Sequence, residues 1–175
     1  MEFCKAVTQD LPFIAGIYDE IHTQEEAGNA TVGWVRGVYP TAETAAQALN
    51  RDDLFVLKAD GQIVGAAIIN QCQVDVYRGA HWDCRPDDAQ IMVLHTLVIS
   101  PKASGKGFGR AFVRFYEEYA LAHGCPYLRM DTNARNLRAR AFYSGLGYRE
   151  IGIAPCNFNG IDGVQLVLLE KELIS

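Results

Sequence analysis

The sequence predicts a mixed α/β fold in one domain, and three observations support this prediction. Strand-like and helix-like segments follow one another in the order β-α-α-β-β-β-α-β-α-β-β. The 175 residues correspond to about one domain, and no repeat, low-complexity tract or linker divides them. Hydrophobic residues make up 49% of the chain, which is enough to form one ordinary core. We therefore expect a single domain over residues 1–175.

Apolar periodicity and turn residues define the expected elements. Apolar residues at spacings of three and four indicate helices, whereas β-rich or continuous apolar runs indicate strands. The pair Asp60-Gly61 between two β-rich runs predicts a hairpin, because these residues accept positive φ. Asp10 and Thr41 are expected to cap the first two helices. The expected strands are 3–8, a hairpin over 54–70, 91–100, 126–132, 148–154 and 164–173, and the expected helices are 10–28, 41–53, 107–124 and 135–147.

Charge and cysteine content argue against several classes of protein. The net charge of −5 disfavours a nucleic-acid binder, because phosphate contacts need clustered Lys and Arg. The five cysteines are scattered and form no C-x-x-C pair, which argues against a metal site and fits the reduced thiols of a cytoplasmic protein. The N-terminus lacks a signal-peptide pattern, and no apolar run is long enough to span a membrane. We expect a cytoplasmic protein with no metal, nucleic-acid or membrane partner.

The stretch PKASGKGFGRAF, residues 101–112, places three glycines between the apolar run 91–100 and a helix-like run. Glycine lets the backbone approach a phosphate closely, and the N–H groups and dipole of a helix start attract anions. The stretch therefore predicts a phosphate cradle, while a flexible strand–helix turn with incidental glycines stays open. Neither the P-loop pattern nor the dinucleotide pattern G-x-G-x-x-G is matched, which disfavours a nucleotide-phosphate binder.

Two motifs resemble the GCN5-related N-acetyltransferase (GNAT) superfamily. That family's acyl-CoA loop follows a strand ending L-x-V-x-P and reads Q/R-x-x-G-x-G/A. Here LVISP at 97–101 precedes Ser104-Gly105-Lys106-Gly107-Phe108-Gly109, with Ser104 in place of Gln or Arg. The family's later motif N-x-x-A-x-x-x-Y-x-x-x-G-F/Y is matched in the same register by Asn136, Ala139, Tyr143, Gly147 and Tyr148.

The resemblance implies a mostly antiparallel mixed sheet with a central splayed parallel pair, flanked by about four helices. It also implies acetyl-CoA as the cofactor, with its pyrophosphate on the N–H groups of residues 105–110 and its arm along the preceding strand. The N–H of Ile99 would polarise the acetyl carbonyl. Lys102 is a candidate to replace the long side chain that is missing at position 104. The implied cofactor-binding residues are Leu97, Val98, Ile99, Ser104, Gly105, Lys106, Gly107, Phe108, Gly109, Arg110, Asn136, Ala139 and Tyr143.

The same resemblance implies that Tyr143 is the general acid that protonates the departing thiolate, although a core aromatic is the alternative. A base must also accept the proton of the attacking ammonium. His95 interrupts the apolar strand and titrates in the useful range, so it is our candidate base, with a satisfied core histidine as the alternative. Further candidate bases that the sequence does not rank are Asp131, Glu25, Glu26 and Asp83.

Two loops, residues 28–40 and 73–84, are expected to face the acetyl group in this fold. Their large side chains either wall the acceptor pocket or pack beneath the loops as a satellite cluster. Arg36 or Arg78 would hold a carboxylate of an amino-acid or peptide-like acceptor. The candidate substrate residues are Trp34, Arg36, Tyr39 and Trp82.

These observations predict an N-acetyltransferase that moves an acetyl group from acetyl-CoA to a primary amine of a small molecule or peptide. The amine would attack directly, without a covalent enzyme intermediate. A catalytically silent acyl-CoA-binding regulatory module is the alternative, because Ser104 departs from the motif and the base is unassigned. The resemblance is also compatible with a homodimer formed through the later strands.

Overall fold

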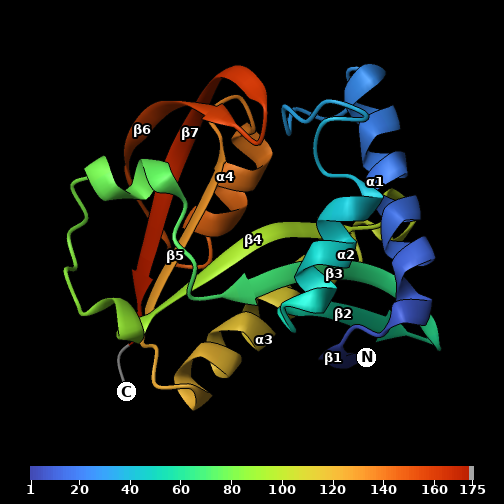
Figure 1. Cartoon of the computed structure of the whole chain (residues 1–175), viewed down its shortest axis with the longest axis horizontal. Coiled ribbons are helices and arrows are strands. Elements are labelled where there is room, and N and C mark those ends of the chain that lie inside the picture. The colour runs from blue at the N-terminus through green and yellow to red at the C-terminus, as the bar shows by residue number, and fades with distance from the viewer. Residues whose placement is uncertain (174–175) are drawn as a thin grey trace.

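One mixed sheet lies at the centre of the protein in a computed structural model that describes residues 1–173 (Figure 1). Its strands are β1 (Glu2–Lys5), β2 (Leu54–Ala59), β3 (Gln62–Asn70), β4 (Ile91–Ile99), β5 (Tyr127–Asn133), β6 (Arg149–Phe158) and β7 (Ile161–Glu172). They lie in the order β1-β2-β3-β4-β5-β7-β6. Every neighbouring pair is antiparallel except β4 and β5, which are parallel. The expected mixed, mostly antiparallel sheet is confirmed.

Within the described residues, four α-helices cover the two faces of this sheet. They are α1 (Leu11–Glu26), α2 (Ala42–Asn50), α3 (Phe108–Ala122) and α4 (Leu137–Ser144). Helices α1 and α2 pack on one face, and α3 and α4 share a core cluster on the other (Figure 1). No helix among residues 1–173 has the length and apolar character that a membrane span requires.

Strand β2 shows how the sequence fills both faces. Leu54 and Val56 point into the cluster beneath α1 and α2, whereas Phe55 and Leu57 point into the cluster beneath α3. Alternation along a strand sends neighbouring side chains to opposite faces, so a continuous apolar run indicates a strand that is covered on both sides. Full burial of each such side chain contributes about 1.5–3 kcal/mol. The sheet is therefore held rigidly at its centre.

The parallel strands β4 and β5 pair only at one end. Residues 91–93 of β4 pair with residues 127–129 of β5, and within residues 1–173 these two strands do not pair with each other beyond that point. On its other edge, β4 carries a bulge at Thr96, whose φ is +49°, where the register against β3 shifts. The bulge bends β4 and increases its twist away from β5. The expected splay of the central parallel pair is thus confirmed.

Two of the expected local signals are confirmed and one is wrong. Asp60 and Gly61 form the β2–β3 turn with positive φ at both residues. The Thr41 hydroxyl accepts from the Thr44 N–H, and the Thr44 hydroxyl accepts from the Thr41 N–H at 2.9 Å. Asp10 does not cap α1 with its side chain, because its carboxylate accepts from Val7 N–H, three residues upstream, instead.

The segments at the C-terminal end and in the long polar connection differ from expectation. Strands β6 and β7 extend farther than predicted and meet at Asn159-Gly160, where both residues have positive φ. Pro155 lies within β6, which is tolerated because β6 is an edge strand. The connection 71–90 contains the short 3₁₀ helices η2 (Asp75–Gly79) and η3 (Asp88–Gln90), and the remaining short ones are η1 (Thr8–Asp10) and η4 (Pro101–Ala103).

Gly65 allows β3 to approach β4 closely beside the bulge, so replacing it tests the strain at the splay. A Cβ at Gly65 would lie 2.6 Å from Ile99 Cδ1 and 2.8 Å from the Val98 carbonyl oxygen. We expect Gly65→Ala to lower the free energy of unfolding by about 1–3 kcal/mol. Gly16→Ala, in open space on α1, is the control and should raise it by about 0.5–1 kcal/mol. Urea denaturation measures both, and an unchanged Gly65→Ala protein would contradict the close approach.

Candidate active site

The glycine-rich loop ends in the first turn of α3 with unpartnered backbone donors. Gly105 and Gly107 have φ of 78° and 80°, and Gly107 is the N-cap residue of α3. Within residues 1–173, the N–H groups of residues 105–110 form no hydrogen bond. A helix N-terminus with free N–H groups and a positive dipole end is a binding site for anions.

A cavity lies directly on this loop, and we call it the loop cavity. Its walls come from the end of α1, residues 29–32, the glycine loop and α4. Arg110 and Arg138 line it and bring positive charge to the unpartnered N–H groups. Lys102 and Lys106 instead line a neighbouring groove beside α1, where Lys102 pairs with Glu20. Lys102 thus lies outside the lining of the loop cavity, whereas Arg138 lines it together with Ser104.

A narrow cleft of about 120 Å³ lies between the separated parts of β4 and β5, and we call it the sheet cleft. Val32, Asn136 and Ala139 line both the loop cavity and the sheet cleft, so the two are continuous. Asn136 is the N-cap residue of α4 and accepts from the Ala139 N–H at 3.1 Å. An elongated ligand can therefore extend from the glycine loop into the middle of the sheet.

Backbone groups of β4 face the sheet cleft without a strand partner. The Ser100 N–H donates to the Val64 carbonyl on the β3 side at 2.8 Å. Because backbone groups alternate along a strand, the Ile99 N–H points away from β3, and Ile99 lines the loop cavity where it adjoins the sheet cleft. The Val98 N–H then points toward β3, and the Val98 side chain is buried in the cluster beneath α1 and α2. Of this pair, Ile99 is therefore the donor available to a ligand, and Val98 packs in the core.

Tyr143 of α4 lines the sheet cleft. It packs against Phe142 and Tyr148, and no hydrogen bond of its hydroxyl is found within residues 1–173. Burial, and secondly the nearby charge of Asp131, raise the pKa of Tyr143 well above its usual value. The phenol is therefore protonated at neutral pH and available as a proton donor.

Asp131 of β5 lies where the sheet cleft opens on the other side. Its Oδ2 accepts from the Tyr77 hydroxyl at 2.7 Å. Burial raises the pKa of Asp131 to about 6, while the hydrogen bond from Tyr77 opposes that rise. Tyr77 is held in turn by Trp82, whose indole N–H donates to the Tyr77 carbonyl at 2.9 Å. Asp131 is thus an ionised carboxylate at pH 7 whose proton affinity is higher than normal.

A third hollow opens beyond Asp131 between α2, β4 and the β6–β7 turn, and we call it the α2 groove. Tyr39, Thr96, Asp131 and Phe158 line both the sheet cleft and this groove, so the two meet at Asp131. His95 also lines the groove. The loop cavity, sheet cleft and α2 groove therefore form one path that passes through the splay of β4 and β5.

His95 is held by a chain of polar side chains behind the groove. Its Nε2 lies 3.0 Å from Asn70 Oδ1, and the Asn70 amide donates to Asp53 at 2.7 Å. Because Asn70 Oδ1 also accepts from the Cys72 N–H, this contact favours a proton on His95 Nε2. Burial lowers the pKa of His95 to about 4, although the Asp53 carboxylate opposes the change. His95 is therefore neutral near pH 7 and a weak proton acceptor.

Comparison with known proteins identifies the family of this fold and site. A model of the Acetyltransferase (GNAT) family matches residues 16–148. The chain belongs to the GNAT family. It is 28% identical over 78 residues to an uncharacterized N-acetyltransferase of Methanocaldococcus jannaschii, a match that covers 44% of this chain and 49% of that protein. The chain thus spans about half the length of this curated relative.

Solved structures show the GNAT fold over the whole chain. A GNAT-family acetyltransferase of Streptococcus agalactiae has a TM-score of 0.83 at 21% identity, covering 99% of this chain and 96% of that one. The yncA structure of Salmonella typhimurium, with its cofactor acetyl-CoA, has a TM-score of 0.70 at 14% identity, covering 100% and 95%. At these identities the likeness establishes the fold alone.

Among the expected acceptor residues of this GNAT protein, the structure brings Trp34 and Tyr39 to the sheet cleft. Trp82 lies elsewhere, because its side chain is buried beneath the loop 73–84 with the Arg129 guanidinium 4.1 Å from its ring. It belongs to the satellite cluster that was the alternative for these large loop residues. Trp82 supports Asp131 only indirectly, through Tyr77.

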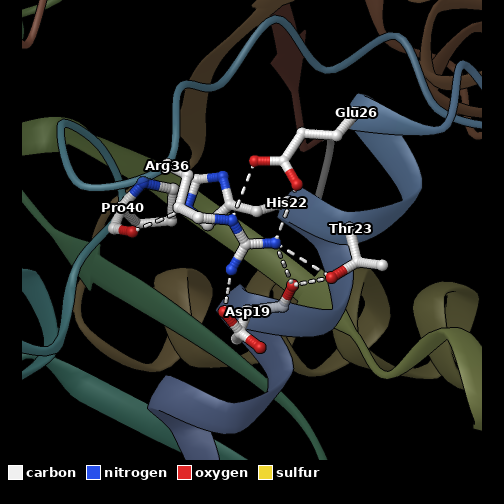
Figure 2. A network of polar contacts seen from close by, with 6 residues as sticks. All are labelled: Asp19, His22, Thr23, Glu26, Arg36 and Pro40. Atoms are coloured by element: carbon white, nitrogen blue, oxygen red, sulfur yellow. Dashed lines mark hydrogen bonds and ion pairs between the residues drawn. The ribbon is translucent and has the colours of Figure 1, made fainter.

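Arg36 does not line the path either. Figure 2 shows its guanidinium over α1, where its Nε donates to Glu26 at 2.8 Å and a terminal nitrogen donates to Thr23 at 2.9 Å. It also pairs with Asp19. We expected Arg36 to bind a carboxylate of the acceptor, but the structure pairs it with Asp19 and Glu26 of α1 instead. Arg36 anchors the loop that carries Trp34 and Tyr39.

The other unranked candidate bases are committed to ion pairs. Glu25 contacts Arg135 at 3.3 Å, Glu26 contacts Arg36, and Asp83 contacts Arg149 at 2.8 Å. None of them lines the sheet cleft among the described residues, whereas Asp131 does. Arg138, Phe158 and Thr96 also line the site, and the sequence did not predict them. The motif spacing around Asn136 would have located Arg138. Phe158 is found only from the folded β6–β7 hairpin, and Thr96 only from the bulge in β4.

The hydrogen bond from Tyr77 should set the pKa of Asp131. Tyr77→Phe removes the donor that stabilises the ionised carboxylate, so we expect the Asp131 pKa to rise by about one unit. Titration of ¹³C-labelled aspartate carboxyl carbons by NMR measures this, with the signal assigned by its loss in Asp131→Asn. Tyr116→Phe is the matched control, because that equally buried hydroxyl donates to the Met92 carbonyl at 2.7 Å. An equal Asp131 shift in both variants would contradict a direct effect.

Proposed function

We propose that this GNAT-family protein transfers an acetyl group from acetyl-CoA to a primary amine by direct attack. The observation that carries the proposal is the continuous path from the unpartnered N–H groups of residues 105–110 to Asp131 and Tyr143. The path passes between two strands whose facing backbone edges are unpaired beyond their first residues. Such a path fits a ligand that has an anionic group at one end, a thin polar arm and a reactive group at the other end.

The residues along the path fit acetyl-CoA, which would supply an acetyl group activated as a thioester. The N–H groups of residues 105–110, with Arg110 and Arg138, would hold its phosphates. The unpaired edges of β4 and β5 would hydrogen-bond its amide-containing arm. Ser104 leaves room in the loop cavity where family members have a longer side chain, and Arg138 provides a cation there.

We assign Asp131 as the general base that takes the proton from the ammonium of the acceptor. A base is most effective when its pKa is close to the working pH. The pKa of Asp131 is raised to about 6, whereas that of His95 is lowered to about 4. Asp131 also lines both the sheet cleft and the α2 groove, whereas His95 lines only the groove. Our prediction from the sequence that His95 is the base therefore gives way to Asp131.

Ile99 of β4 and Tyr143 of α4 would provide the two remaining functions. The Ile99 N–H would stabilise negative charge on the carbonyl oxygen during attack, an effect commonly worth about 3–4 kcal/mol. Tyr143 would donate its hydroxyl proton to the departing sulfur, because its pKa is raised and its phenol lines the cleft. No cysteine lines the sheet cleft among residues 1–173, which supports direct attack rather than an acyl-cysteine.

Asp131→Asn should lower catalytic activity and, at high pH, raise the free energy of unfolding. Loss of the base should lower kcat/KM at pH 7 by about 10²–10⁴-fold. The same variant should be more stable than the parent at pH 8 by about 2–3 kcal/mol, because the folded pKa of about 6 lies above the unfolded value of about 4. The protonated carboxyl is favoured by folding, so this stability difference should shrink to about 0.5 kcal/mol or less at pH 4. Urea denaturation at both pH values measures it, and equal stability at pH 8 would contradict the raised pKa.

Tyr143→Phe should lower turnover and leave the affinity for acetyl-CoA nearly unchanged. The variant removes only the hydroxyl that would protonate the leaving sulfur, so we expect kcat to fall by about 10²-fold or more. Stopped-flow or steady-state thiol release measures kcat, and calorimetry measures acetyl-CoA binding. Unaltered turnover would remove Tyr143 from the mechanism.

The proposal as a whole is tested by incubating the protein with acetyl-CoA and a broad panel of primary amines. Thiol release together with the mass of an acetylated amine would support it. Tight coenzyme A binding without acetylation of any amine would instead favour the silent acyl-CoA-binding module. Thermal stabilisation by ATP in place of coenzyme A would favour a nucleotide-phosphate binder.

A further inference from the structure

We propose that the acceptor is a primary amine with no carboxylate on the carbon next to its nitrogen. This inference rests on the proposed function, and it concerns the end of the path that receives the amine. To be deprotonated, the amine nitrogen must reach Asp131, where the sheet cleft and the α2 groove meet. A substituent on the neighbouring carbon must then lie close to the same carboxylate. The charges around Asp131 therefore decide which amines fit.

The sheet cleft provides no cation for such a carboxylate. Among the described residues that line it there is no Lys, Arg or His, and its one carboxylate is Asp131. The cleft is also narrow, with a volume of about 120 Å³, so a carboxylate beside the nitrogen has little room to turn away from Asp131.

The α2 groove has one arginine among the described residues, Arg51, and this cation is already paired. Its Nε lies 2.9 Å from Asp53 Oδ2, and its terminal nitrogen lies 3.4 Å from Asp53 Oδ1. Asp53 is buried and holds the Asn70 amide at 2.7 Å, so it keeps Arg51 in place. His95, which the Asn70 side chain contacts, is neutral near pH 7 because burial lowers its pKa to about 4. The charge of Arg51 is thus balanced by Asp53 and His95 is neutral, so neither adds net positive charge to the groove.

The two loop arginines that we first considered as carboxylate ligands lie off the path. Arg36 is enclosed by Asp19 and Glu26 on α1 (Figure 2). The Arg78 side chain is 85% exposed and has Asp75 as its nearest acidic neighbour, at 3.9 Å. Neither lines the sheet cleft or the α2 groove. Amino-acid recognition through these loops is therefore not supported by the structure.

An α-amino acid would thus bring a carboxylate next to the Asp131 carboxylate without a compensating cation. Desolvation and like-charge repulsion both oppose this arrangement. Glu43 at the groove adds further negative charge, which attracts an ammonium and repels an anion. A neutral amide or alkyl group beside the nitrogen avoids both penalties. The neutral side chains of Gln47, Gln73 and Asn159 on the groove walls suit such polar but uncharged substituents.

Matched pairs of acceptors test this inference on the intact protein with acetyl-CoA. Alanine, leucine and phenylalanine are each compared with the corresponding amino-acid amide, and kcat/KM is expressed per concentration of neutral amine because the amides are weaker bases. Isopropylamine is a stringent addition, since it lacks the carboxylate but is a stronger base than alanine. We expect each amide, and isopropylamine against alanine, to be preferred by about 100-fold or more. Binding of each compound, followed by NMR, should show the same order.

Arg51→Gln tests whether Arg51, the one arginine of the α2 groove among the described residues, binds a carboxylate of the acceptor. We expect the variant to leave the alanine to alaninamide ratio unchanged, because Arg51 is bound to Asp53. Two results would overturn this inference and leave the proposed function standing. One is an amino acid with the same kcat/KM as its amide. The other is a kcat/KM that falls in Arg51→Gln for alanine but not for alaninamide. Failure to acetylate any amine of the broad panel would overturn the proposed function, and this inference with it.

Discussion

The separation of β4 from β5 after their first paired residues is the constraint on which the rest of this structure depends. Unpaired backbone groups inside a sheet are costly, and each buried one left unsatisfied costs about 1–3 kcal/mol. The bulge at Thr96 and the close approach at Gly65 hold the strands in this arrangement. Tyr39 enters from the α1–α2 loop and hydrogen-bonds the Thr96 hydroxyl. The protein thus maintains an opening that ordinary strand pairing would close.

Two connections that look irregular in the sequence keep this opening in its shape. The loop between α1 and α2 is fixed by Arg36 to α1, so that Trp34 and Tyr39 reach the sheet cleft. The polar connection 71–90 buries Tyr77 and Trp82 against the sheet, and Tyr77 then holds Asp131. Large side chains that form hydrogen bonds or ion pairs hold both loops in place. This explains why such residues occur in these loops, since a flexible loop would not need them.

The sequence predicted the elements that local rules determine, and it missed what depends on long-range contacts. Continuous apolar runs and the Asp60-Gly61 pair located the strands, and the glycine loop located the start of α3, because these signals act over a few residues. Arg36 was misplaced because its loop folds back onto the preceding helix α1, where Asp19 and Glu26 pair with it, and local rules do not determine that fold-back. Trp82 was misplaced because burial of a loop residue requires the folded sheet beneath it. Ranking Asp131 required its burial, which composition and spacing do not encode.

Asp131 and Tyr143 show how burial between the separated strands β4 and β5 adjusts the pKa values of an acid and a base. Both groups are removed from water, which raises both pKa values, yet the carboxylate stays ionised and the phenol stays protonated at pH 7. Two titratable groups with well-separated pKa values can take and give protons in one turnover without exchanging roles. The charge of Asp131 also raises the pKa of Tyr143, which keeps the phenol protonated while the carboxylate is ionised. A fully paired β4 and β5 would bury neither group beside a reacting ligand, so the acid and the base both depend on the same opening in the sheet.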